Sequence, residues 1–234
     1  MKKISRVLIL SILFLLSNFV YAQEYNPVAD PGAVVILKNA RFTVLTSGVI
    51  RIEWAQDSVF EDHASLVFVN RNLSVPEFKK KIKHGWLQIK TDKFTLKYKI
   101  DSGRFTDKNL QIEFNFDGIK KVWNPGQENK GNLSGTARTL DGYDGNIQHW
   151  SKKKIDLGKG IISKEGWVLI DDSKRALFDN SEWQWVIPRP EKKLQDFYFF
   201  CYGYDYKRAL KDYIKIAGKI ALPPKFAFGI WWSR

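Results

Sequence analysis

The sequence contains a single cysteine, Cys201, among 234 residues. One cysteine cannot form a disulfide within the chain, which excludes the small disulfide-stapled domains found among secreted proteins. Cys201 stands in the apolar run DFYFFCYGY, with no histidine arranged beside it in the sequence. We therefore interpret it as a core residue and not as a nucleophile.

Histidine is almost as scarce, and the common cofactor motifs are missing. His63, His84 and His149 are far apart and lack the spacing of metal ligands. The chain has no phosphate-binding or dinucleotide-binding glycine pattern. It has no G-x-S-x-G nucleophile motif either, because GNLSG (Gly131 to Gly135) places its serine one position late. We predict neither a metal nor an organic cofactor.

The formal net charge is +13, which raises the question of a nucleic-acid partner. The lysines are scattered, and several alternate with apolar residues, as in KFTLKYKI. That alternation is typical of a solvated sheet face, and lysines on edge strands also oppose aggregation. No helix-turn-helix, zinc-ligand or stacking motif accompanies the charge, so we expect no nucleic-acid partner.

The first 22 residues have the three parts of a secretory signal peptide. Lys2, Lys3 and Arg6 precede an apolar run of ten residues, and VYA then fits the cleavage site. Cleavage would leave Gln23 as the first residue, and an uncleaved anchor is the alternative. We expect export to the periplasm or the exterior, with no membrane span in the mature chain.

Alternation of apolar and polar residues dominates residues 23–204. In KFTLKYKI, for example, Phe94, Leu96, Tyr98 and Ile100 share one face. Turn signals such as DSGRF and FDGIK separate the runs, and many short strands with such punctuation predict an antiparallel β-sandwich. The expected strands are Ala33–Leu37, two within Arg41–Trp54, Ser65–Val69, Gly85–Lys90, Lys93–Ile100, Leu110–Phe116, Ile119–Trp123, Gly166–Asp171, Trp183–Ile187 and Phe197–Tyr202.

The pattern changes after residue 204. Apolar residues recur at helical spacing from Asp205 to Lys219, with Asp205 as N-cap and Gly218 as the stop. Pro223 and Pro224 prevent the helix from continuing. The following FAFGIWW is apolar on both faces, as a strand buried on both sides of a parallel sheet requires. We expect a helical linker at 205–224 and the opening strand of a further domain at 225–234.

Three stretches carry candidate binding or catalytic groups. Asp171 and Asp172 are adjacent, so on a strand they face opposite ways and cannot flank one sugar ring. Their pattern favours a turn at a strand end. Glu182, Trp183 and Trp185 form a possible sugar-stacking surface, although two tryptophans two residues apart favour a core role.

The third stretch is the irregular segment from Asn124 to Asn146, which has five glycines and no periodicity. Long ordered loops are often functional. Arg138 and Asp141, three residues apart, could bind sugar hydroxyls; the alternative is a structural loop with an internal salt bridge.

Three blocks together resemble the N-terminal region of glycoside hydrolase family 31, the α-glucosidase and α-xylosidase family. They are GNLSGTARTLDGYDGN, KGIISKEGWVLIDDS and YDYKRALKDYIKIAGKIALPPKFAFGIWWSR. The resemblance implies an N-terminal β-sandwich, one helix and then the first strand of a (β/α)₈ barrel. It also implies a retaining hydrolase of α-linked glucosides or xylosides, whose two catalytic aspartates lie on later barrel strands, beyond Arg234.

From the resemblance we expect no catalytic residue in these 234 residues and no activity of the chain alone. The family's sandwich contributes a loop that shapes the sugar pocket, and Gly131 to Gly145 matches it, with Arg138 and Asp141 as its hydrogen-bonding groups. The expected partner is an oligosaccharide or a polysaccharide-derived α-glycoside. A free-standing carbohydrate-binding sandwich and a basic secreted scaffold module are the alternatives.

Overall fold

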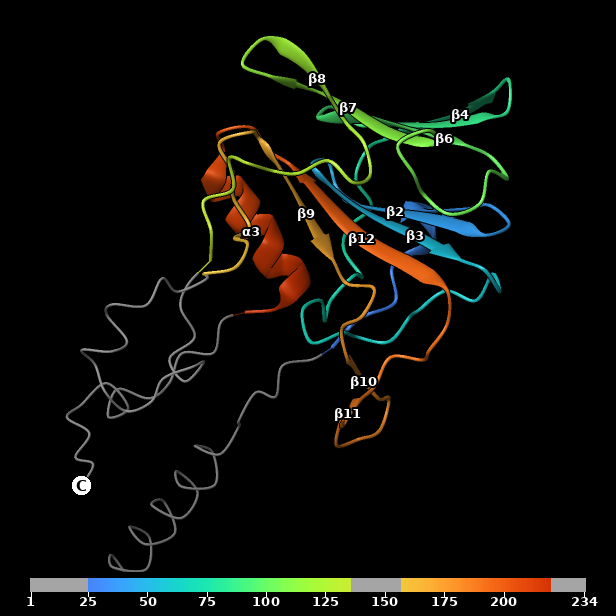
Figure 1. Cartoon of the computed structure of the whole chain (residues 1–234). Coiled ribbons are helices and arrows are strands. Elements are labelled where there is room, and N and C mark those ends of the chain that lie inside the picture. Colours follow the sequence, from blue (N-terminus) through green and yellow to red (C-terminus); the bar gives the residue numbers. More distant parts are fainter. Residues whose placement is uncertain (1–24, 136–156, 220–234) are drawn as a thin grey trace, which may run out of the picture.

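The computed structural model describes residues 25–135 and 157–219, and its body is two five-stranded antiparallel sheets stacked face to face (Figure 1). The first sheet contains, in spatial order, β1 (Val34–Ile36), β2 (Ala40–Thr46), β3 (Val49–Ala55), β12 (Leu194–Cys201) and β9 (Trp167–Asp171). A short 3-10 helix, η1 (Pro31–Ala33), precedes β1. The predicted antiparallel sandwich is confirmed.

The second sheet is a meander in which each strand pairs with the next along the chain. Its strands are β4 (Lys79–Lys83), β5 (Trp86–Lys90), β6 (Phe94–Lys99), β7 (Leu110–Phe116) and β8 (Ile119–Trp123). Two of its hairpins turn on a residue pair with positive φ, His84-Gly85 and Asp117-Gly118. Such pairs match the right-handed twist of the flanking strands, which is why X-Gly turns are frequent in short hairpins.

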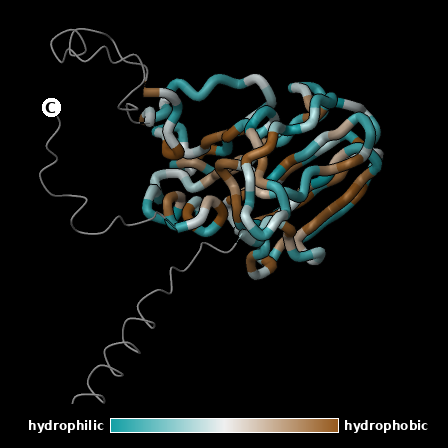
Figure 2. The backbone as a smooth tube through the Cα atoms, turned by 90° about the horizontal axis from the view of Figure 1, so that it is seen from below, coloured by the Kyte–Doolittle hydropathy of each residue, from teal (hydrophilic) through white to brown (hydrophobic). Residues whose placement is uncertain are grey.

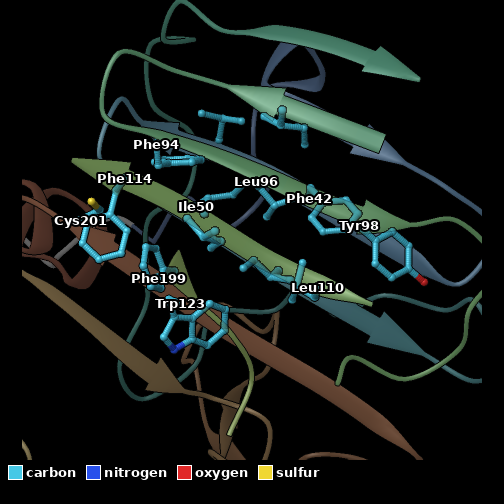
Figure 3. Packing of buried hydrophobic residues seen from close by; sticks show 14 of the residues in the cluster. Phe42, Ile50, Phe94, Leu96, Tyr98, Leu110, Phe114, Trp123, Phe199 and Cys201 are labelled. Carbon is cyan, nitrogen blue, oxygen red and sulfur yellow. The ribbon is translucent and has the colours of Figure 1, made fainter. Parts of the chain in front are cut away.

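The main core lies between the two sheets (Figure 3). Phe42 and Phe199 from the first sheet meet Tyr98 and Phe114 from the second, with ring centroids 5.4 and 6.2 Å apart. Cys201 is buried in the same cluster, and burial raises the pKa of its thiol to about 12. The prediction that Cys201 is a core residue is therefore confirmed.

The outer face of the first sheet is covered as well, by the segment between β3 and β4 and by the helix α3 (Tyr206–Ala217). Ile216 of the helix packs in a second apolar cluster with Tyr198 and Phe200 of β12. Because both faces of β2 and β3 are covered, almost every residue in these strands is buried. Figure 2 shows hydrophobic segments running through the body of the domain, with hydrophilic ones on the connecting loops.

Both ends of the helix α3 lie where the sequence predicts them. The Asp205 carboxylate accepts a hydrogen bond from the Arg208 N–H, and Gly218 at the C-cap has a φ of 89°. The helical spacing of apolar residues predicts a buried face that includes Leu210, and this face needs one correction. Asp212 is buried while Leu210 is exposed, because Asp212 binds the Tyr202 hydroxyl beneath the helix.

Two strand predictions need correction, and the sequence patterns miss two further strands. Ser65–Val69 is no strand and contributes only one isolated bridge, between Ser65 and Leu177. Trp183–Ile187 is reduced to β11 (Val186–Ile187), which pairs with the unpredicted β10 (Leu177–Phe178). The sequence also gives no signal for β4, because KKKIK has a single apolar residue and therefore no alternation. All five residues of this strand are exposed. The expected signal peptide and the expected barrel strand at 225–234 lie outside the described residues.

Candidate functional site

The described residues include the base of the long loop predicted to reach a sugar. Residues 131–135 run antiparallel to residues 157–164: the Leu133 N–H donates to the Ile162 carbonyl at 3.1 Å, and the Gly135 N–H donates to the Gly158 carbonyl at 3.0 Å. Arg138 and Asp141 lie between these two segments, outside the described residues. The roles of Arg138 and Asp141 stay predictions, and the structure describes the base from which their loop departs.

Asn132 holds this base together. Its side-chain amide donates to the Gly160 carbonyl at 2.9 Å, and its carbonyl oxygen accepts from the Gly160 N–H at 2.8 Å. The same oxygen accepts from the Ser134 N–H at 2.9 Å. A Cβ on Gly160 would lie 2.1 Å from the Ser134 carbonyl oxygen, so the two segments cross more closely than any residue with a side chain allows.

The loop base is also fastened to the first sheet. The Asn129 side chain donates to the carbonyl of Trp167, on the edge strand β9, and accepts from the Ser163 hydroxyl at 2.7 Å. In the described part of the chain β9 is an edge strand, so the backbone groups on its outer side have no partner strand. The Asn129 amide supplies a hydrogen-bond donor to one of these carbonyl groups. A loop with such a base starts from a fixed position beside the sheet.

A groove of about 720 Å³ lies along β9, next to the loop base. Its volume is in the range of small-ligand sites. Its walls mix polar and charged side chains with apolar and aromatic ones: Gln127, Glu128, Asn129, Asn132, Lys159, Asp171 and Arg175 on one hand, and Val67, Ile161, Trp167, Val168, Leu169, Ile170 and Tyr213 on the other. Two acids, Glu128 and Asp171, and two bases, Lys159 and Arg175, line the groove, so it offers both hydrogen-bond acceptors and donors.

Asp171 and Asp172 face opposite ways, as predicted. Asp171 is exposed and accepts from the Ser173 N–H in a turn at the strand end, whereas Asp172 is completely buried. The Asp172 carboxylate accepts from the Ser65 hydroxyl and from Arg189, both at 3.1 Å. Burial, reinforced by the nearby Asp196 charge and opposed by Arg189, raises the pKa of Asp172 to about 7.

Asp172 belongs to a buried ionic network on the outer face of the first sheet. Arg51 bonds Asp196 through two N–H groups, and Arg41 bonds Glu53 at 2.6 Å. Arg41 and Arg51 also donate to the Glu61 carbonyl, which ties the segment between β3 and β4 onto the sheet. These carboxylates are enclosed and ion-paired, so we assign them a structural role and not a catalytic one.

Sequence reasoning missed this network. Arg41, Arg51 and Glu53 alternate with apolar residues, as polar groups do on a solvated strand face. Only the segment folded over that face converts them into a buried cluster. No local pattern in RFTVLTSGVIRIEW separates the two outcomes.

The prediction of a core role for Trp183 and Trp185 is wrong. Their exposed fractions are 80% and 70%, and the hairpin that carries them projects from the sandwich (Figure 1). The β10–β11 pairing is only two residue pairs long, so the residues between the strands form a surface loop. The alternative interpretation, a surface that can stack on a sugar, is compatible with this position.

Neither a metal site nor a membrane helix is found in the described parts of the chain. Within residues 25–135 and 157–219, no three histidine, cysteine, aspartate or glutamate side chains form a group that could hold a metal ion. The ring of His63 contacts the Glu61 carboxylate at 2.6 Å, but among the described residues no third metal-binding side chain joins this pair. Among the described helices, none has the length and apolar character needed to cross a bilayer.

No protein-family model matches the chain. A curated relative, an α-xylosidase from Saccharolobus solfataricus, is 30% identical to it over 133 residues. The predicted resemblance to the α-glucosidase and α-xylosidase family is confirmed. The aligned part is 54% of this chain but only 18% of the α-xylosidase, so the chain spans about a fifth of that relative's length.

Two solved structures of glycoside hydrolase family 31 overlap with most of the chain. One is a variant of a dextranase from Flavobacterium johnsoniae in complex with isomaltotriose, with a TM-score of 0.47 and 16% identity over 88% of this chain and 30% of that one. The other is an α-xylosidase from Xanthomonas citri, with a TM-score of 0.40 and 13% identity over 86% of this chain and 41% of that one.

Proposed function

We propose that the chain is the N-terminal, non-catalytic part of an exported, retaining α-glycosidase that removes terminal α-linked glucose or xylose from oligosaccharides. The observation that carries this proposal is the sequence similarity to an α-xylosidase. In the proposed organisation, residues 1–22 direct export, 23–204 form the sandwich, 205–224 link the domains, and 225–234 open the catalytic barrel. The reaction needs no cofactor.

The division of labour follows from what retaining hydrolysis requires. Two carboxyl groups must lie about 5 Å apart across the scissile bond, one as nucleophile and one as acid and base. Among the described residues, the buried carboxylates of Glu53, Asp172 and Asp196 are held by arginines. We therefore assign the chemistry to aspartates of the barrel, at the C-terminal ends of its strands.

The sandwich would contribute substrate recognition through its long loop. Asn132 and Asn129 fix the loop base beside the groove along β9, so the residues that follow leave from a defined point. Arg138 and Asp141 are the proposed hydrogen-bonding groups for sugar hydroxyls. Such groups discriminate strongly, because a sugar that lacks the matching hydroxyl leaves them unpaired.

The proposal is tested with chromogenic α-glucosides and α-xylosides. The 234-residue chain is expected to give no turnover, and a version extended by the roughly 250 residues of a barrel, read from the coding sequence after Arg234, is expected to hydrolyse at least one substrate. Turnover by the 234-residue chain, or an extended version without glycosidase activity, contradicts the proposal.

The loop assignment is tested in the extended version with Asp141→Ala. This change should raise KM for oligosaccharides while leaving thermal stability within about 0.5 kcal/mol of the parent. Asp107→Ala, at an exposed carboxylate in the connection between β6 and β7, is the matched control and should alter neither quantity. A fall in stability with unchanged KM would assign Asp141 to a structural salt bridge.

A carbohydrate-binding sandwich without catalysis is the second candidate. The exposed tryptophans Trp183 and Trp185 favour it. Glycan binding by the chain, combined with an extended version that has no glycosidase activity, would support this candidate over the first.

A further inference from the structure

The β10–β11 hairpin displays the two most exposed large hydrophobic side chains in the described part of the chain, Trp183 and Trp185. An exposed tryptophan forgoes a favourable free energy, because burying a large apolar side chain stabilises a folded protein or a complex by about 1.5–3 kcal/mol. Exposed aromatic side chains gathered on one short segment therefore indicate a binding surface. The folding of the sandwich does not use them.

The loop that carries the tryptophans is held in place before any ligand arrives. One oxygen of the Asp179 carboxylate accepts from the Trp185 N–H at 2.9 Å, the Ser181 N–H at 3.2 Å and the Ser181 hydroxyl at 2.6 Å. The Asp179 N–H donates to the Trp185 carbonyl, and the Ser181 hydroxyl also reaches the Trp183 carbonyl. A loop ordered in advance loses less conformational entropy on binding.

The base of the hairpin is anchored to the sandwich. Arg189, just after β11, donates to the Arg175 carbonyl at 3.1 Å and pairs with the buried Asp172 and Asp196. On the other strand, the Phe178 N–H donates to the Ala64 carbonyl, and the Phe178 ring packs on Tyr25 at 4.9 Å. The tryptophans therefore stand on a fixed support.

The charge of the hairpin restricts the kind of ligand. Residues 177–187 contain two acids, Asp179 and Glu182, and no lysine or arginine, in a chain of net charge +13. Nucleic acids need cations for their phosphates beside the stacking rings, and anionic membranes need them as well. Of the basic residues that flank the hairpin, Arg189 is buried in ion pairs, and the exposed Lys174 and Arg175 precede β10. The loop between the two strands therefore presents no cation of its own to a polyanion.

The polar side chains between and beside the rings suit a neutral ligand with both apolar and hydroxyl-bearing faces. Glu182 and Gln184 are exposed and alternate in sequence with the two tryptophans, so the same loop carries hydrogen-bond acceptors and donors. A pyranose has C–H groups on its faces and hydroxyls around its edge. Two tryptophans two residues apart can contact neighbouring units of an extended chain.

We infer that the Trp183–Trp185 hairpin is a binding platform for a neutral polysaccharide chain, separate from the Arg138 and Asp141 loop. It would hold a polymer against the sandwich whether or not the protein hydrolyses it, so this inference is independent of the proposed catalytic role. A protein partner, a nucleic acid and a membrane are the competing occupants.

The test is native affinity electrophoresis of the chain from Gln23 onward in gels that contain dextran, soluble starch or xyloglucan. At least one polysaccharide should slow the wild-type chain. Trp183→Ala and Trp185→Ala should each weaken the binding about tenfold, as the loss of about 1.4 kcal/mol of stacking predicts. Ile119→Ala, at a 64% exposed residue on the other sheet, is the matched control and should bind like the wild type.

A second measurement needs no variant. Saturating polysaccharide should reduce the quenching of tryptophan fluorescence by acrylamide, because it covers the most exposed rings. Three results would overturn the inference: no retardation in any of the three gels, retardation that both tryptophan variants retain, or tryptophan-dependent binding to neutral phosphatidylcholine vesicles or oligonucleotides without polysaccharide binding. Circular dichroism of each variant confirms that it is folded.

Discussion

Arg51 on β3 and Asp196 on β12 form a buried ion pair that contains two hydrogen bonds. The Arg51 Nε donates to Asp196 Oδ1 at 2.9 Å and its Nη2 donates to Oδ2 at 2.7 Å, and each side chain is 2% exposed. Burial raises and the arginine lowers the pKa of Asp196, and the arginine prevails, so this pKa lies below its ordinary value. The pair joins two strands that 145 positions separate in sequence.

Asp196→Ala should lower the free energy of unfolding by about 3–5 kcal/mol, because it leaves the Arg51 charge buried without its main partner. The measurement is urea unfolding followed by tryptophan fluorescence. Lys120→Ala, which removes a largely exposed partner of Glu113, is the control and should cost less than about 1 kcal/mol. Equal effects of the two changes would show that the buried pair contributes little.

Asp172→Asn should flatten the dependence of stability on pH. The folded pKa of Asp172 is about 7, above the value of about 3.9 in the unfolded chain. Between these values the folded state holds the extra proton, so the contribution of Asp172 to stability is fully present below pH 4 and is lost as pH rises through 7. The variant, which cannot ionise, should therefore gain melting temperature relative to the wild type on going from pH 5 to pH 8.

Asp171→Asn is the control for that experiment, since the neighbouring Asp171 is exposed. Its melting temperature should follow that of the wild type at both pH values. If Asp172→Asn also does so, Asp172 is ionised throughout this range and the network tolerates its charge.

Tyr202→Phe should loosen α3 from the sheet. The Tyr202 hydroxyl bonds Asp212 on the helix at 2.6 Å and Thr46 on β2 at 2.8 Å. Its removal should cost about 1–3 kcal/mol, because Asp212 and Thr46 then lose a partner in a buried position. Thermal unfolding by circular dichroism measures this, with Tyr204→Phe, at a 57% exposed tyrosine, expected to be neutral.

Gly160→Ala should disrupt the base of the long loop. The new Cβ would meet the Ser134 carbonyl, a backbone atom that cannot move away without breaking the bonds of Asn132. We expect a loss of more than about 2 kcal/mol in urea unfolding. Gly85→Ala, at a turn glycine with φ 75° and open space around its Cα, should cost only about 1 kcal/mol. A smaller loss at Gly160 than at Gly85 would mean that the two segments can separate freely.

The alternation of apolar residues along the chain was enough to predict the sandwich. In β6 and β7, residues such as Phe94 and Ile112 face the core at every second position, because side chains in a strand alternate between two faces. The helix was predictable for a similar local reason, since Asp205 and Gly218 are chemically suited to its two ends. The family resemblance came from sequence too, and the match to an α-xylosidase confirmed it.

Tertiary structure alone decided which polar residues are buried and which aromatic ones are exposed. Arg51 and Trp185 illustrate both cases: each sits in an alternating segment, yet the arginine is enclosed and the tryptophan lies in water. Burial depends on what packs over a strand face, and that partner comes from a distant part of the chain. Cys201 shows the same limit, because its apolar neighbours in sequence predict a core position, while its enclosure depends on the packing of both sheets.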